Sequence, residues 1–234
     1  MLNQNPVKQS FTVSLSPRTR KRLKEGQVPE LGTVLIVAVL IVIVVITYTW
    51  GKALFDAQKT RTTADYMSGK LFEIKGAILA VAHEGANSSR IVRLDISEGL
   101  FSINNGTFCS NKNMDRNSIV FNITTKSRLI GSDTFSSIDP LEANTSCDAP
   151  YGNSSVAILM GKSEKAGNSY VNSYTLWFRN LSQPNGASNN FYVINVTHTG
   201  PQKLGSGSST LVVKNLGTIN SSFTIYTTVQ VDIT

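Results

Sequence analysis

One uncharged stretch constrains this chain more than any other feature. Residues 31–50 are 20 in a row without Asp, Glu, Lys or Arg, and half of them are Val or Ile. A run of this length either spans a lipid bilayer or lies deep inside a helical bundle. A plain cytosolic globular enzyme is therefore not expected. The 150 residues from Gly85 onward suffice for one core.

The helical pattern continues well past the membrane-spanning length. No Pro occurs between Lys52 and His83. Apolar residues recur three or four positions apart in this region, at Met67, Leu71, Ile74, Ile78 and Val81. Such spacing predicts one helix over residues 30–83, about 80 Å long at about 1.5 Å per residue. Since a bilayer core needs only about 30 Å, we expect the remainder to pack on the chain's own outer domain, on neighbouring copies, or on both.

The basic residues sit on one side of the apolar run. Residues 1–26 contain six Lys or Arg and a single acid, Glu25. Basic residues that flank a span stay in the cytoplasm, so we expect the chain after Gly51 to face outward. A basic tail can also bind nucleic acid, but this one has no interleaved aromatic residue apart from Phe11, and we expect no nucleic-acid partner.

The junction at residues 24–37, Lys-Glu-Gly-Gln-Val-Pro-Glu-Leu-Gly-Thr-Val-Leu-Ile-Val, resembles the processing site of archaeal type IV pilin-like proteins. Its second half is also similar to the Gly-Thr-Leu-Ile-Val stretch of archaellins, the subunits of the archaeal flagellum. The resemblance implies a class III signal peptide, which a prepilin peptidase cuts between Gly26 and Gln27. Glu30 would be the fourth mature residue, whereas many type IV pilins carry this acid at the fifth position.

The resemblance also implies an organisation in three parts. Residues 1–26 would be the leader, residues 27–84 a helix that spans the membrane before assembly and forms the filament core afterwards, and residues 85–234 an extracellular immunoglobulin-like domain. The expected partners are copies of the chain itself, the prepilin peptidase, the membrane assembly machinery, and the membrane before assembly. The expected core-forming residues of the helix are Val34, Ile36, Leu40, Ile43, Met67, Leu71, Ile74 and Ile78.

The pattern after Gly85 and Asn87 changes from helical spacing to alternation. Strands are expected at residues 119–124, 156–160, 174–179, 191–197, 210–214 and 223–232, with weaker signals at 91–94 and 100–103. Short strands with no helical pattern between them predict an antiparallel β-sandwich, so the fold class is α+β. In the last strand, alternation predicts a buried face made of Phe223, Ile225, Val229 and Val231.

Two kinds of covalent modification are expected in an outward-facing domain. Cys109 and Cys147 are predicted to form a disulfide, the alternative being two unrelated thiols. Eight Asn-X-Ser/Thr sites are candidates for N-glycosylation, of which the two inside predicted strands, Asn122 and Asn195, are the least favourable. The eight are Asn87, Asn105, Asn122, Asn144, Asn153, Asn180, Asn195 and Asn220.

No pattern in the sequence indicates catalysis. The two histidines, His83 and His198, lie on different elements, and no His, Cys or carboxylate cluster has metal-ligand spacing. We expect no catalytic, cofactor or metal site, and no enzyme activity. Glu30 has two interpretations: a carboxylate that pairs with the new amino terminus of Gln27 on a neighbour, or one that is solvated at the membrane boundary.

The sequence therefore predicts a structural subunit of an archaeal type IV pilus-like surface filament, used for adhesion. Three alternatives remain open at this point: an archaellin of the motility filament, a minor pilin or pseudopilin, and a single-pass anchored ectodomain that binds a ligand.

Overall fold

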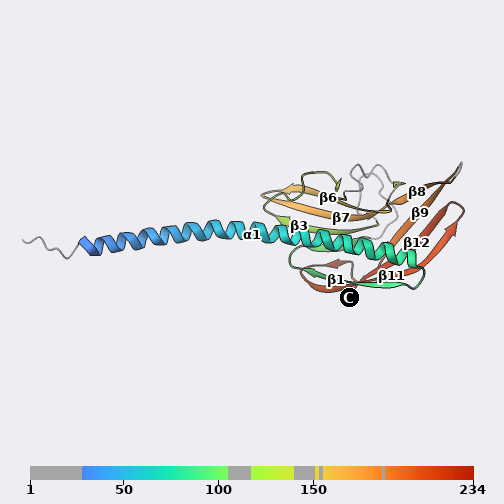
Figure 1. The fold of residues 1–234 in the computed structure, drawn as a ribbon, viewed down its shortest axis with the longest axis horizontal. Helices are drawn as coiled ribbons and strands as arrows, with labels where there is room; N and C mark the ends of the chain where they lie inside the picture. The colour runs from blue at the N-terminus through green and yellow to red at the C-terminus, as the bar shows by residue number, and fades with distance from the viewer. Residues whose placement is uncertain (1–27, 105–116, 140–150, 153–154, 186–187) are drawn as a thin grey trace, which may run out of the picture. The chain divides into compact units, whose positions relative to one another are not determined.

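The computed structural model describes residues 28–104, 117–139, 151–152, 155–185 and 188–234. Residues 53–234 form one compact unit, and the residues before Ala53 form another. The β-sheet domain therefore includes the second half of the N-terminal helix as one of its own elements (Figure 1).

The helix α1 runs from Val28 to Glu84, as the apolar spacing predicts. The next residue, Gly85, stops the helix: its φ of 93° is in the left-handed region, which glycine adopts at little cost. The Ser88 hydroxyl donates to the carbonyl oxygens of Val81 and Gly85 at 2.9 and 2.7 Å, which satisfies acceptors that the last helical turn leaves open.

The strands of the described residues form two six-stranded sheets. The first has the order β1-β11-β12-β9-β8-β5, with bounds β1 Ser89–Ile96, β5 Tyr151–Gly152, β8 Asn180–Asn185, β9 Ser188–Thr197, β11 Gly207–Ser221 and β12 Thr224–Ile233. The second has the order β10-β2-β3-β7-β6-β4, with bounds β2 Leu100–Asn104, β3 Ser118–Thr125, β4 Ser136–Ser137, β6 Ala157–Ala166, β7 Ser169–Phe178 and β10 Lys203–Leu204.

The α+β class is confirmed, and each expected strand overlaps an observed one. Alternation did not predict β8 or the two-residue strands β4, β5 and β10. Two pairings are parallel, β12 with β9 and β5 with β8, so the sheets are mostly rather than wholly antiparallel.

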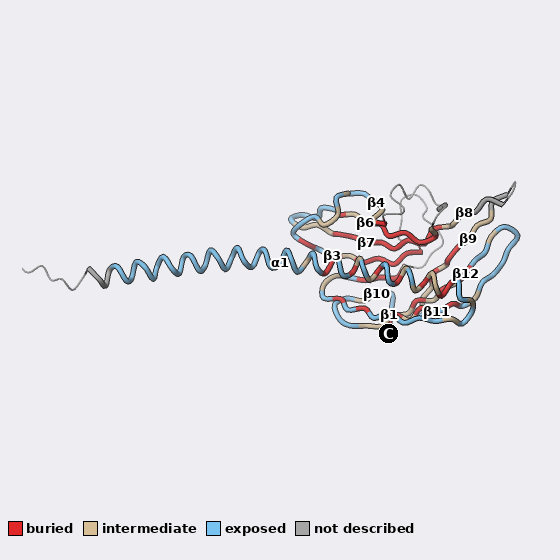
Figure 2. Tube along the Cα trace, viewed as in Figure 1, coloured by how far each residue is buried: buried red, intermediate tan, exposed pale blue. Residues whose placement is uncertain are grey.

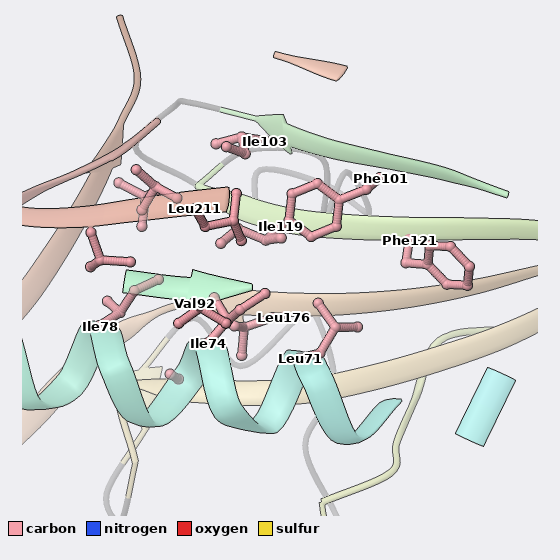
Figure 3. Packing of buried hydrophobic residues seen from close by; sticks show 14 of the residues in the cluster. Leu71, Ile74, Ile78, Val92, Phe101, Ile103, Ile119, Phe121, Leu176 and Leu211 are labelled. Atoms are coloured by element: carbon pink, nitrogen blue, oxygen red, sulfur yellow. The ribbon is translucent and has the colours of Figure 1, made fainter. Parts of the chain in front are cut away.

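One hydrophobic core joins the two sheets and the second half of α1. From the helix it takes Met67, Leu71, Ile74, Ile78 and Val81, all with no exposed surface. Figure 3 shows Leu71, Ile74 and Ile78 directed at core residues of the strands, among them Val92 and Leu176. Residues three or four apart share one helix face, which is why this single stripe is buried.

The predicted buried face of β12 is only half right. Val229 and Val231 have no exposed surface, but Phe223 is 57% and Ile225 is 40% exposed, while Thr227 is buried. The difference arises because α1 covers only part of this strand. Val229 pairs with Asn215, whose side-chain amide bonds to the carbonyl of Val81 near the end of α1. Strand positions farther along the hairpin extend beyond the part of the sheet that α1 covers.

A long connection after β3 is fixed to the second sheet by buried polar groups. The backbone N–H of Leu129 donates to Asn172 Oδ1, and that of Ile130 donates to the Ser163 hydroxyl. Asn172 and Ser163 are both buried. The start of this connection is therefore bound to β6 and β7.

Candidate assembly surface

The first half of α1 leaves its apolar side chains uncovered. Every large apolar side chain from Val34 to Ile46 is between 49% and 68% exposed, and Figure 2 shows this part of the helix as exposed throughout. Among the described residues, this helix is long and apolar enough to cross a membrane. An apolar surface of this extent needs lipid or other protein around it.

Two threonine hydroxyls inside the apolar segment are satisfied within the helix itself. The Thr47 hydroxyl donates to the carbonyl oxygen of Ile43 at 2.8 Å, and the Thr49 hydroxyl donates to those of Val45 and Ile46 at 3.0 and 2.9 Å. In an environment without water, unpaired hydroxyls would be costly. These bonds therefore suit the segment to a bilayer or to a packed bundle of helices.

The structure divides the eight expected filament-core residues into two groups. Val34, Ile36, Leu40 and Ile43 are exposed and free to pack against other helices. Met67, Leu71, Ile74 and Ile78 have no exposed surface because the chain's own sheets cover them. These four belong to the core of the domain, and the exposed apolar surface of α1 lies in the segment before it.

Several predicted site residues fall outside the described residues. Gly26 and Gln27 at the expected cleavage point do so, as do Cys109 and Cys147 of the expected disulfide and the sequon residues Asn105, Asn144 and Asn153. Glu30 lies within the bounds of α1. Cleavage, the disulfide and both interpretations of Glu30 therefore stay predictions.

The five described sequon residues differ in how accessible they are. Asn87 is exposed in the turn between α1 and β1, with a φ of 68°, and Asn220 is exposed near the end of β11. Asn122 and Asn195 are half-buried inside β3 and β9, where the sequence predicted strands, and Asn180 is half-buried at the start of β8. Exposed turns are the favourable positions for a glycan.

Two ionisable side chains of the described residues, Tyr174 and His83, pack beside aromatic rings. No three His, Cys, Asp or Glu side chains of that part come close enough together to hold a metal ion. Burial raises the pKa of Tyr174 above its ordinary value, but this ring packs beside Phe121 at 6.4 Å between centroids. His83 stacks on Tyr192 at 6.0 Å, at the end of α1. Each of these groups is accounted for by packing.

Sequence reasoning missed two surface features of the β-domain. One is the exposed apolar end of the β11–β12 hairpin, which alternation assigned to the core. The other is a groove between α1 and the end of β3, which includes Ala57 and Lys126. The absence of any charged residue over 215–231 was a visible signal for the first. The groove depends on contacts distant in the sequence and had no such signal.

Comparison of the chain with models of protein families, with curated proteins and with solved structures found no match. The architecture itself is consistent with that of type IV pilin-like proteins, since a long N-terminal apolar helix is followed by a β-sheet domain. A helix of this kind associates the chain with a membrane or with secretion.

Proposed function

We propose that this chain is a structural subunit of an archaeal type IV pilus-like surface filament. The observation that carries the proposal is the contrast along α1: the large apolar side chains of residues 34–46 are all exposed, whereas the stripe from Met67 to Val81 is buried in the chain's own core. The first segment is thus left for contacts with lipid and then with other copies.

The same segment serves in two environments in succession. The precursor lies in the cell membrane through residues 31–50, and the prepilin peptidase removes residues 1–26. The helices then leave the bilayer and pack side by side in an extracellular filament. Because lipid is as apolar as the helix surface, transfer from lipid to a bundle gains little hydrophobic energy. Extraction therefore requires the membrane assembly machinery.

The β-domain coats the outside of this filament and meets other surfaces, which suits adhesion. Its strands carry many Ser, Thr and Asn side chains, as in β11 and β12. A structural role of this kind needs no cofactor and no catalytic group.

Deletion of the chain in its native cells tests the proposal. The expected result is loss of a class of surface filaments and of attachment to surfaces, with swimming retained, and recovery of both when the full chain is restored. Loss of swimming in place of attachment would identify an archaellin. Filaments and attachment that remain unchanged would contradict the major-subunit role, and the membrane fraction would then be examined for an anchored ectodomain.

A further inference from the structure

The far end of the β11–β12 hairpin is apolar at positions where a soluble domain is usually polar. Ile219 is 70% exposed, Tyr226 44% and Leu216 50%. Ile219 and Tyr226 are direct cross-strand partners and so lie on the same face of the sheet. Phe223 occupies the turn that joins the two strands and is 57% exposed, although turns favour Gly, Asn, Asp, Ser and Pro.

This hairpin also lacks the charges that usually protect a free strand edge. No Asp, Glu, Lys or Arg occurs in residues 215–231. The pairing of β1 with β11 stops at Lys214, so β11 continues to Ser221 without β1 beside it (Figure 2). Natural proteins normally place charges on such edges to prevent association. An uncharged apolar end favours association instead.

The groove between α1 and the end of β3 offers a surface of matching chemistry. Four lining residues belong to α1, and four belong to the end of β3 and the residues after it. They are Ala53, Asp56, Ala57, Thr60, Thr124, Thr125, Lys126 and Ser127. The Thr60 hydroxyl donates to the carbonyl oxygen of Asp56 at 2.9 Å, and the Thr125 hydroxyl donates to that of Ser127. These two hydroxyls are satisfied internally, and the surface of the groove is mostly apolar although Asp56 and Lys126 also line it.

The size of the groove matches a side chain better than a small-molecule ligand. Its volume is about 280 Å³. Ligand pockets usually have a volume of at least about 300 Å³. One aromatic side chain with its neighbours on a turn fits such a space. Phe223 is an exposed aromatic side chain in the turn at the end of the hairpin, where it could enter such a space.

The hairpin and the groove lie at opposite ends of the β-domain. The hairpin begins where Asn215 bonds to the carbonyl of Val81, near the end of α1, while Ala57 lines the groove. The helix between Ala57 and Val81 is about 36 Å long at about 1.5 Å per residue. A contact between two different surfaces of one chain is heterologous, and it produces an open filament when the rotation between successive copies does not close into a ring.

We infer that the Phe223 hairpin of one copy docks into the Ala57 groove of the next copy along the filament. The inference rests on the proposed function, because it names the partner of the β-domain as a second copy of this chain. It adds a head-to-tail contact between β-domains to the packing of the apolar helix segments.

Cysteine cross-linking in the full chain tests this contact. Cells producing the double variant Phe223→Cys with Ala57→Cys are mildly oxidised, the surface filaments are sheared off, and the protein is separated without reductant. A ladder of covalent dimers, trimers and longer species is expected. The wild-type chain controls for Cys109 and Cys147, and Ser208→Cys with Ala57→Cys, which places the cysteine on an exposed position at the start of β11, is expected to give no ladder.

Other patterns would overturn the inference. Dimers from Phe223→Cys alone would indicate a symmetric hairpin-to-hairpin contact, and filaments without a ladder would mean that the two surfaces do not meet. If wild-type chains never enter filaments, the proposed function fails. The same oxidation of detergent-solubilised chains, which can orient freely, then decides the contact separately, since a ladder there supports it and its absence rejects it.

A second variant measures how much the contact contributes. Phe223→Ser is expected to reduce the recovery of filaments at least tenfold while the chain accumulates in the membrane at the wild-type level. Ile91→Ser is the matched control, because it removes another strongly exposed apolar side chain, on β1, and it is expected to leave recovery within twofold. Equal losses from the two variants would overturn the assignment of the hairpin.

Discussion

Lys75 on α1 and Asp139 form an ion pair with 2.5 Å between Nζ and Oδ2. The Asp139 side chain is 4% exposed and that of Lys75 15%. The pair fixes the connection after β3 to the helix, so it joins two parts of the domain that are 64 residues apart in the sequence. Asp139 is more deeply buried than Lys75. Substitution of one partner should therefore change the stability of the domain by a different amount from substitution of the other.

Lys75→Met should destabilise the domain more than Asp139→Asn. Removal of the lysine leaves a buried carboxylate without its cation, which costs about 3 kcal/mol. Removal of the carboxylate leaves an ammonium group closer to water, with an expected cost of about 1 kcal/mol. Urea unfolding of the full chain in detergent measures both values. An equal or reversed order would show that Asp139 does not depend on Lys75.

Substitution of Asn215 should destabilise the domain more than its position in an exposed hairpin suggests. Its Nδ2 donates to the carbonyl of Val81 at 2.9 Å, and its Oδ1 accepts from the N–H of Gly217 at 2.7 Å, at the β-bulge of β11. Asn215→Ala should cost about 2 kcal/mol, because the carbonyl of Val81 and the part-buried N–H of Gly217 each lose a hydrogen-bond partner. Asn220→Ala, at an exposed position on the same strand, is the control and should change the urea midpoint little.

The buried stripe of α1 can be tested with two isoleucines. Ile74 has no exposed surface, whereas Ile91 on β1 is 69% exposed. Ile74→Ala should reduce the free energy of unfolding by about 3 kcal/mol, since it opens a cavity in the core. Ile91→Ala should reduce it by less than about 1 kcal/mol. Similar costs for the two would mean that α1 does not pack on the sheets as described.

These residues also mark how far the sequence predicts the fold. Spacing of three and four identifies Ile74 and its neighbours as one helix face, because a helix repeats with a fixed period. The same reasoning fails for Phe223 and Ile225, since alternation gives a strand's two faces but not where the covering layer ends. The parallel pairing of β12 with β9 and the pair Lys75–Asp139 depend on distant contacts that no local pattern encodes.

The candidate assembly surface, too, could be predicted from the sequence only in part. Val34 to Ile46 could be identified from composition alone, because any uncharged run of this length requires lipid or protein around it. The sequence could not show whether Met67 faces a neighbouring copy or its own domain, since an apolar helix face has the same spacing in both cases. The groove beside Ala57 required the fold.

Asp232 gives the stability of the domain a dependence on acid pH. Partial burial alone would raise its pKa, but hydrogen bonds from Thr199, Gln230 and the N–H of Gly200 lower it below the ordinary value of 3.8. A carboxyl with a lowered pKa in the folded chain stabilises above pH 3.8 and loses this contribution as the pH falls through the folded pKa. The stability difference between the wild-type chain and Asp232→Asn should therefore shrink below about pH 4. A difference that is constant across this range in unfolding experiments would contradict the assignment.

Glycosylation should follow the accessibility of the sequons. Asn87, exposed in a turn, should be occupied to a greater extent than Asn122 and Asn195, which lie half-buried within β3 and β9. Asn220 is exposed in the single chain but adjoins the proposed docking hairpin, so it should be unmodified in filaments. Glycopeptide mass spectrometry of sheared filaments measures the four occupancies, and a glycan at Asn220 would argue against the hairpin contact.

The amino terminus of the surface-exposed protein tests the central claim most directly. Mass spectrometry of the N-terminal peptide from protein sheared off the cells should find Gln27 as the first residue, in material that contains filaments. An intact terminus at Met1, with the protein confined to the membrane fraction, would contradict processing and filament assembly together.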